Sequence, residues 1–216
     1  MALIGLFGGT FNPVHYGHIR AAEEVLAHLP LDRILFIPSY IPPHKDSREV
    51  VAVEHRLKMV EIACQNHPKI LVSEIEARNP GRSYSILTLK KLKEINKEDQ
   101  FFFILGSDAF MEIETWKDYT ELLKQCAFVV ISRPGYAFEM LGKVIERIKN
   151  NNSLKVFGPE LPEKVELKEE SIYLLKIRTP AISSSEIRKR LQAGLSISGL
   201  VPPGVEDYIH KFNLYK

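Results

Sequence analysis

Residues 3–18 read LIGLFGGTFNPVHYGH, and the apolar pattern in and after this stretch indicates the fold class. It begins with an apolar run at residues 3–7 that stops at Gly8-Gly9, as a buried strand of a parallel sheet does where it meets a turn. From Gly17 onward, apolar residues recur at helical spacing as far as Leu29. A buried strand, a turn and a helix in this order form the repeating unit of an α/β protein.

The same alternation continues along the chain. Further strands are predicted at residues 33–37, 70–72, 101–105, 128–131 and 172–177, with a weak strand at 156–157. Helices are predicted at residues 53–64, 84–95, 119–123, 138–148, 182–191 and 205–212. Because several strands are apolar throughout, the sheet is expected to be parallel and covered on both faces. We predict a Rossmann-like, doubly wound α/β fold in one domain, residues 1–216, with a small C-terminal helical portion at about 181–216.

Composition sets limits on the partners and the compartment. The chain has 216 residues, 45% of them apolar, and its 29 basic against 27 acidic residues leave a net charge of +2. No basic stripe is interleaved with aromatic residues, so nucleic acid is not an expected partner. No run approaches the roughly 18 apolar residues of a membrane-spanning helix, and the first residues lack the basic segment of a secretion signal. We therefore expect a cytoplasmic protein without a membrane partner, and the sequence leaves a homo-oligomer open.

The two cysteines, Cys64 and Cys126, lie far apart in apolar surroundings. We expect two reduced, buried thiols rather than a disulfide or a redox pair.

The loop after the first strand is the first candidate site, because ligands of a doubly wound sheet bind beyond the carboxyl ends of its strands. Its glycines lack the G-x-G-x-x-G spacing, and the chain has no G-x-x-x-x-G-K-[ST] motif, which disfavours dehydrogenase and P-loop chemistry. His15 and His18 flank Gly17 at a helix start, where two imidazoles and free N–H groups suit a phosphate. In one alternative the histidines only cap the helix. In another they bind zinc, although no further ligands lie nearby in sequence.

A second candidate site lies at the start of the helix predicted at residues 182–191. Ser183 and Glu186 have capping-box spacing, so Ser183 is predicted to cap this helix. Arg188 then falls near the first turns, where a cation opposes the helix dipole. A bound anion would resolve that conflict, and the β- and γ-phosphates of ATP are the natural candidates. A solvated arginine in an ordinary capped helix is the alternative.

Taken together, these segments resemble the motifs of the HxGH nucleotidyltransferase superfamily. Their sequences are most similar to those of the bacterial nicotinate-nucleotide adenylyltransferases. The resemblance spans nearly the whole chain. It is carried by GGTFNPVHYGH at 8–18, PPHK at 42–45, RLKM at 56–59, SYS at 83–85, FILGSD at 103–108, Trp116, RPG at 133–135, ISSSEIR at 182–188 and VPPGVEDYI at 201–209.

Four positions depart from the family pattern. Asn12 stands where Asp is usual, and Ser85 stands where Thr is usual. Asn79 replaces an expected Arg and Leu87 an expected Asp, both beside the segment that would hold the pyridine ring. If those two residues form an ion pair in relatives, losing both together is less damaging than losing one.

The resemblance implies an enzyme that joins ATP and nicotinate mononucleotide to give nicotinate adenine dinucleotide and pyrophosphate in NAD biosynthesis, with Mg²⁺ carried by ATP and no metal held by the protein. It implies catalytic roles for His15, His18, Lys45 and Arg188. The implied ATP contacts are Gly8, Gly9, Thr10, Phe11, Gly106, Asp108, Ser183 and Ser184. The implied contacts to nicotinate mononucleotide are Tyr84, Ser85, Trp116, Lys117 and Arg133.

Several of the implied roles have a structural alternative. Trp116 could be a core residue, Asp108 a helix N-cap, Tyr84 and Ser85 a helix start, and Lys45 a solvated loop lysine. At the level of function, the alternatives are an adenylyltransferase for nicotinamide mononucleotide or phosphopantetheine and a non-catalytic nucleotide-binding regulator.

Overall fold

The structure is a computed structural model that describes residues 1–42, 50–132, 138–150, 154–158 and 165–216. In this part of the chain, one sheet of seven strands has the order β3-β2-β1-β4-β5-β7-β6, and each neighbouring pair is parallel. The strands are β1 (Leu3–Gly9), β2 (Arg33–Pro38), β3 (Ile70–Val72), β4 (Gln100–Gly106), β5 (Ala127–Ile131), β6 (Lys155–Phe157) and β7 (Ser171–Leu175). The predicted doubly wound parallel sheet is confirmed.

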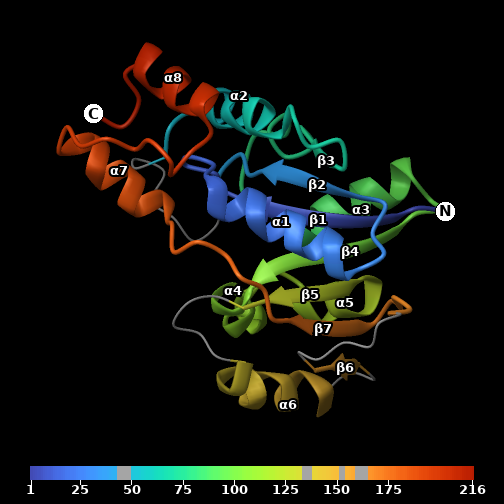
Figure 1. The fold of residues 1–216 in the computed structure, drawn as a ribbon. Helices are drawn as coiled ribbons and strands as arrows, with labels where there is room; N and C mark the ends of the chain where they lie inside the picture. Colours follow the sequence, from blue (N-terminus) through green and yellow to red (C-terminus); the bar gives the residue numbers. More distant parts are fainter. Residues whose placement is uncertain (43–49, 133–137, 151–153, 159–164) are drawn as a thin grey trace.

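Strand β1 is the point at which the chain changes direction across the sheet. Leu6 pairs with Leu35 of β2 on one side and with Phe103 of β4 on the other. The chain steps outward from β1 to β2 and β3 and then returns to β4, so the connections leave β1 and β4 in opposite directions (Figure 1). Such a switch point opens a crevice at the carboxyl ends of the two strands.

Helices cover both faces of this sheet (Figure 1). They are α1 (Tyr16–His28), α2 (Val53–Cys64), α3 (Ser85–Ile95), α4 (Ser107–Met111), α5 (Tyr119–Gln125), α6 (Gly142–Asn150), α7 (Ser184–Gln192) and α8 (Pro203–Lys211). Alternate residues of β4 point to opposite faces, as the period of a strand requires. Phe102 and Ile104 therefore pack in the core under α1, α2, α7 and α8, whereas Phe101 and Phe103 pack in the core under α3 to α6.

Two local elements differ from the sequence expectation. Directly after β4 the chain forms α4 and the 3-10 turn Ile113–Thr115, where the sequence indicated only a turn. Ser107, Phe110 and Ile113 are fully buried there, but the element is too short to show a helical period. The helix predicted at residues 138–148 begins as a 3-10 helix, Phe138–Leu141, and continues as α6.

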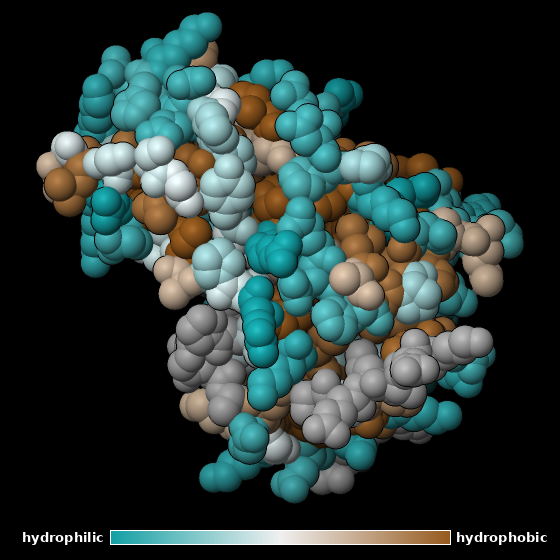
Figure 2. Space-filling model, viewed as in Figure 1, coloured by the Kyte–Doolittle hydropathy of each residue, from teal (hydrophilic) through white to brown (hydrophobic). Residues whose placement is uncertain are grey.

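Both cysteines are free and buried, as predicted. Burial raises the pKa of Cys64 to about 12 and also raises the pKa of Cys126. Within the described ranges, no helix combines the length and the apolar character needed to cross a bilayer. On the face shown in Figure 2, hydrophilic residues make up much of the outermost surface, and hydrophobic residues show mainly between them.

Candidate active site

Two cavities open at the carboxyl ends of the strands, on either side of the end of β1. One, of about 270 Å³, is bounded by His18 of α1 and by the segment at residues 179–183 that leads into α7, and we call it the α7 cavity. The other, of about 310 Å³, is bounded by the end of β1 and by the start of α3, and we call it the α3 cavity. Phe7 and Asp108 line both cavities. The two spaces therefore meet at the switch point of the sheet.

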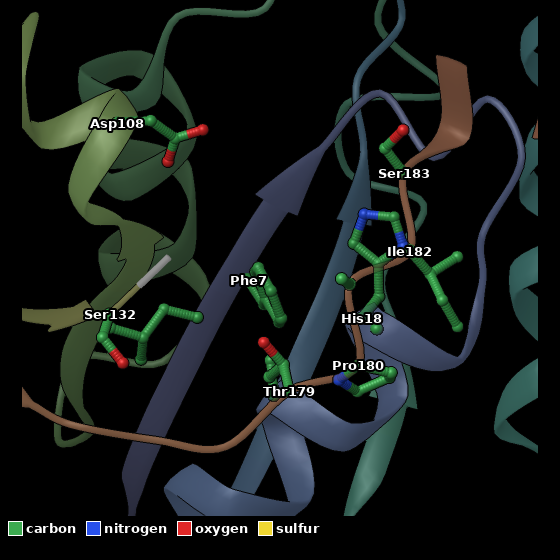
Figure 3. Close-up of a pocket in the computed structure, with 12 residues that line it drawn as sticks. Phe7, His18, Asp108, Ser132, Thr179, Pro180, Ile182 and Ser183 are labelled. Carbon is green, nitrogen blue, oxygen red and sulfur yellow. The ribbon is translucent and has the colours of Figure 1, made fainter. Parts of the chain in front are cut away.

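Figure 3 shows the arrangement of the α7 cavity. His18 and the segment from Thr179 to Ser183 form one side, and Asp108 and Ser132 lie on the opposite side, with Phe7 between them. Ser132 joins two strand ends, because its Oγ donates to the Ile177 carbonyl at 3.1 Å and accepts from the Ile177 N–H at 3.0 Å. The walls of this cavity thus come from five separate parts of the chain, all of which the sheet brings together.

The two histidines of the first loop cap helix α1. His15 is the N-cap residue, and its Nδ1 accepts from the Gly17 N–H at 3.1 Å. His18 reaches back, and its Nδ1 accepts from the His15 N–H at 3.3 Å. The ring centroids are 3.8 Å apart. Both histidines therefore take part in the N-terminal cap of α1.

The cap also determines where the imidazole protons are. A ring nitrogen that accepts an N–H bears no proton, so a neutral imidazole capped through Nδ1 carries its proton on Nε2. Both His15 and His18 are therefore held in the Nε2–H tautomer by the backbone. His15 is 3% exposed, whereas His18 lines the α7 cavity. With Nδ1 accepting from the backbone, the donor of the His18 ring is Nε2–H.

Glycine at position 17 is required by the cap. A Cβ on Gly17 would lie 2.9 Å from both Cε1 and Nδ1 of the His15 ring, a separation well inside van der Waals contact. The glycine between the two histidines therefore serves the packing of the His15 ring.

Side chains of helix α7 are hydrogen-bonded to the first loop. Ser183 caps α7 by accepting from the Glu186 N–H at 3.1 Å, as predicted. Ser184 Oγ donates to the Pro13 carbonyl at 2.9 Å, and a guanidinium nitrogen of Arg188 donates to the Asn12 carbonyl at 3.0 Å. Arg188 is half-buried. The solvated-arginine alternative is wrong, because the side chain spans the gap between α7 and the loop.

Arg56 also holds this loop, through hydrogen bonds to backbone carbonyls. It is 1% exposed and donates to three backbone carbonyls, those of Thr10 at 2.8 Å, Val51 at 2.9 Å and Tyr40 at 2.9 Å. Burial lowers the pKa of its guanidinium. In the sequence, Arg56 stands out only as part of the RLKM segment at 56–59. Its place on the apolar face of α2, three residues before Met59, was the signal that it is buried.

The α3 cavity is bounded by the N-terminus of a helix without a side-chain cap. Tyr84 is the N-cap residue of α3, and its side chain makes no capping hydrogen bond. The first N–H groups of the helix, those of Ser85 and Ile86, have no carbonyl partner within the helix. Trp116 lies across the same cavity, and the Lys117 ammonium lies 5.0 Å from the centroid of the Tyr84 ring. Donors and an aromatic surface therefore face one space.

The sequence of this chain matches proteins of one family. A family model described as cytidylyltransferase-like matches residues 6–190. The probable nicotinate-nucleotide adenylyltransferase of Thermoanaerobacter sp. is 39% identical over 214 residues, covering 99% of this chain and 94% of the relative. The corresponding protein of Geobacter sulfurreducens is 41% identical over 212 residues, with 98% and 97% covered. The chain belongs to the nicotinate-nucleotide adenylyltransferase family. The resemblance predicted from the motifs is confirmed.

A solved structure shows the same fold. The nicotinic acid mononucleotide adenylyltransferase of Plasmodium falciparum, in complex with NaAD, superposes with a TM-score of 0.76 and 24% sequence identity, covering 100% of this chain and 98% of the other. The predicted Rossmann-like fold is thereby confirmed.

Of the eight residues that the adenylyltransferase resemblance assigned to ATP, all but Phe11 and Ser184 line one or both of the cavities. Ser183 lines the α7 cavity and Asp108 lines both, whereas Gly8, Gly9, Thr10 and Gly106 line the α3 cavity. Asp108 is in the first turn of α4, and the N-cap residue is Gly106, so the capping alternative for Asp108 is wrong.

Phe11 has the position of a core residue. It is 2% exposed and stacks on Phe36 with centroids 5.2 Å apart. Phe11 is not among the described residues that line the two cavities.

The four described residues that were assigned to the mononucleotide, Tyr84, Ser85, Trp116 and Lys117, all line the α3 cavity. Trp116 also packs at the edge of the core under α3 to α6, so its structural alternative and its assigned role are compatible. Lys45 and Arg133 lie outside the described residues.

Two of the four departures from the family pattern, Asn79 and Leu87, lie outside the α3 cavity. Leu87 is 43% exposed, and Asn79 is exposed and accepts from the Lys91 ammonium at 2.6 Å. Neither is among the described residues that line the cavity.

Several residues of the cavities were not predicted. Ser39, Ser132 and Thr179 each follow the carboxyl end of a strand, β2, β5 and β7. That position was the available signal, because the carboxyl ends of parallel strands lie at one edge of a sheet. Glu76, after β3, lines the α3 cavity, and no pattern in the sequence indicated it.

Proposed function

We propose that this protein transfers the adenylyl group of ATP to nicotinate mononucleotide, which yields nicotinate adenine dinucleotide and pyrophosphate in NAD biosynthesis. The proposal is supported by relatives of nearly equal length that bear the name of this activity. The observation that carries it is the meeting of two differently lined cavities at Phe7 and Asp108. Two substrates bound in them would bring their reacting groups together at the end of β1.

The linings match the two substrates. In the α7 cavity, His18 and the capped start of α7 suit the phosphates of ATP, since helix starts and imidazole N–H groups bind anions. In the α3 cavity, Trp116 offers a stacking surface for a pyridine ring, and the uncapped start of α3 offers N–H donors for its carboxylate. The two phosphates that react would then lie near Phe7 and Asp108.

The reaction needs no general base. The second pKa of a phosphate monoester is about 6, so the acceptor phosphate is already an anion near neutral pH. One of its oxygens forms a bond to the α-phosphorus of ATP, while the bond from that phosphorus to the bridging oxygen of the β-phosphate breaks and pyrophosphate leaves. Catalysis therefore consists of aligning the two groups and stabilising the charge that develops.

His18 is assigned to the α-phosphate, to which its Nε2–H donates. Lys45 and Arg188 are assigned to the leaving pyrophosphate. His15 is assigned to the same α-phosphate region, and its buried ring also caps the start of α1.

The residues fit a metal that arrives with the substrate. Magnesium binds with one or two carboxylates and substrate phosphates rather than in an all-protein cage. In the described part of the chain, Asp108 is the one carboxylate that lines both cavities, and no three His, Cys, Asp or Glu side chains gather into a metal site. When bound, Mg²⁺ would neutralise charge on the phosphates, with Asp108 within the same space.

The α3 cavity should prefer the acid over the amide. A carboxylate accepts N–H donors on both oxygens, whereas a carboxamide must turn its NH₂ toward one of them. A buried donor left unpaired costs roughly 1–3 kcal/mol, which corresponds to a preference of about ten- to a hundredfold or somewhat more. The backbone N–H groups near Ser85 and Trp116 are the expected source of this preference.

Pyrophosphate release from ATP tests the proposal, measured against nicotinate mononucleotide, nicotinamide mononucleotide and phosphopantetheine. We expect release with the two mononucleotides and a higher kcat/KM for the acid. Equal values, or a preference for the amide, would leave an adenylyltransferase but contradict the nicotinate assignment. Release with phosphopantetheine alone would indicate the other acceptor class. No release with any acceptor would favour the nucleotide-binding regulator.

The domain organisation is part of the same proposal. Ile187 and Leu191 of α7 and Val205 and Ile209 of α8 are buried in one core with residues of α1 and α2. This packing supports one nucleotidyltransferase domain over residues 1–216, with the C-terminal helices as an integral wall.

A further inference from the structure

Glu76 is a carboxylate at an unexpected place. It lines the α3 cavity, where the proposed acceptor brings a carboxylate of its own. Burial raises the pKa of Glu76, and hydrogen bonds from Thr88 and Ser83 oppose that shift. A desolvated carboxylate beside an anionic ligand is unfavourable for both stability and binding. We therefore expect the Glu76 carboxylate to have a role that offsets this cost in stability and binding.

The hydrogen bonds around Glu76 have a defined direction. Ser83 Oγ accepts from the Tyr40 N–H at 2.9 Å, so the Ser83 hydroxyl proton is left for the Glu76 carboxylate, to which Ser83 is hydrogen-bonded. Thr88 Oγ1 donates to Glu76 Oε1 at 2.6 Å. Thr88 is 4% exposed, so this bond lies inside the protein.

These bonds connect three separate elements. Tyr40 follows β2, Ser83 directly precedes the N-cap residue of α3, and Thr88 lies in the first turns of α3. The Ser83 N–H also donates to the Ile41 carbonyl at 3.0 Å, and Ile41 and Arg82 form a parallel β-bridge. The start of α3 is thus hydrogen-bonded to the loop after β2 through Ser83. The Glu76 carboxylate accepts hydrogen bonds from both Ser83 and Thr88, and so links this connection to helix α3.

We propose that Glu76 is a positioning residue for the acceptor: its carboxylate holds Ser83 and Thr88 so that the N–H groups at the start of α3 face the ring of the bound mononucleotide. This inference rests on the proposed function. Glu76 does not touch the reacting phosphates; it acts through the backbone of the segment that recognises the ring.

The test compares Glu76→Gln with the wild-type protein in steady-state kinetics. Glutamine keeps the size of the side chain, but its NH₂ faces one of the two hydroxyl protons, so one hydrogen bond of the network is lost. Loss of one such bond predicts a KM for nicotinate mononucleotide about tenfold higher, with kcat and the KM for ATP within about threefold of wild type. The matched control is Glu74→Gln, two residues earlier in the same segment, which should change neither KM.

Two further measurements separate positioning from general support. The melting temperature of Glu76→Gln at neutral pH should not fall below that of wild type by more than about 2 °C, because removal of a desolvated charge offsets the lost bond. Thr88→Val removes one donor, and the double variant should be about as impaired as Glu76→Gln alone, since both changes affect one network. Additive effects would contradict the network. Equal increases in both KM values with a large drop in melting temperature would assign Glu76 a purely structural role.

Binding without turnover keeps this inference distinct from the proposed function. Trp116 is the only tryptophan and lines the α3 cavity, so its fluorescence reports occupancy by nicotinate mononucleotide. Binding by wild type that is weakened about tenfold in Glu76→Gln, but without pyrophosphate release from ATP, would refute the adenylyl transfer and retain the role of Glu76. Equal binding by the two proteins would overturn the role of Glu76, whether or not adenylyl transfer occurs.

Discussion

Replacement of His18 by alanine is the most direct test of the site. The change removes the Nε2–H that we assign to the α-phosphate, and loss of one such transition-state donor lowers kcat by about a hundredfold or more. It also removes one half of the cap of α1, the hydrogen bond from the His15 N–H, whose length of 3.3 Å indicates a weak interaction. Loss of that bond costs about 0.5–1 kcal/mol. For a domain of this size, the melting temperature should fall by only about 1–4 °C.

The measurements are the initial rate of pyrophosphate release at saturating ATP and nicotinate mononucleotide, and the melting temperature of each variant. His28→Ala is the matched control, because His28 lies at the other end of α1, where its Nδ1 is 2.8 Å from the Glu24 carbonyl. It should lose as much stability and keep its activity. Activity of His18→Ala within a few-fold of wild type would refute the assignment. A loss of activity accompanied by unfolding at the assay temperature would show that His18 serves only as a cap.

Three further results are expected. Arg188→Ala should raise the KM for ATP and lower kcat while the KM of the acceptor stays the same, and ATP should slow amide hydrogen exchange in α7; unchanged exchange at saturating ATP would contradict an anion site there. Gly17→Ala should lower kcat, because the new Cβ would meet the His15 ring at 2.9 Å, and full activity would mean that the ring position is unimportant. Cys64 should resist a thiol reagent at pH 8 in the native protein and react after unfolding, because burial raises its pKa to about 12; rapid labelling of the native protein would contradict that burial.

Much of the fold could be predicted because its signals are local. The helix Val53–Cys64 and the strand Ile70–Val72 have the predicted bounds, since an amphipathic period and a short apolar run are properties of consecutive residues. The cap by Ser183 was predictable for the same reason, because donor and acceptor are three residues apart. Helix α4 was missed, because its five residues span too short a length to show a period.

The candidate site could be predicted only in part. The motifs identified residues that line the two cavities, among them His18, Asp108 and Trp116. They did not indicate that Gly8, Gly9 and Thr10 would line the α3 cavity rather than the α7 cavity. Glu76 was missed because a single glutamate in a polar segment has no pattern that distinguishes it from a solvated one.

Most helices and strands, their order and the family could be predicted from the sequence, because hydrophobic period, helix caps and sequence motifs are properties of neighbouring residues. Which of those elements are in contact follows only from their arrangement in three dimensions. Arg188 reaches a carbonyl 176 residues away, and Arg56 reaches one 46 residues away. Such contacts depend on the order of the strands and on their register. The period of one strand does not encode which strand lies beside it, so the partners of a buried charge become known only when the sheet is assembled.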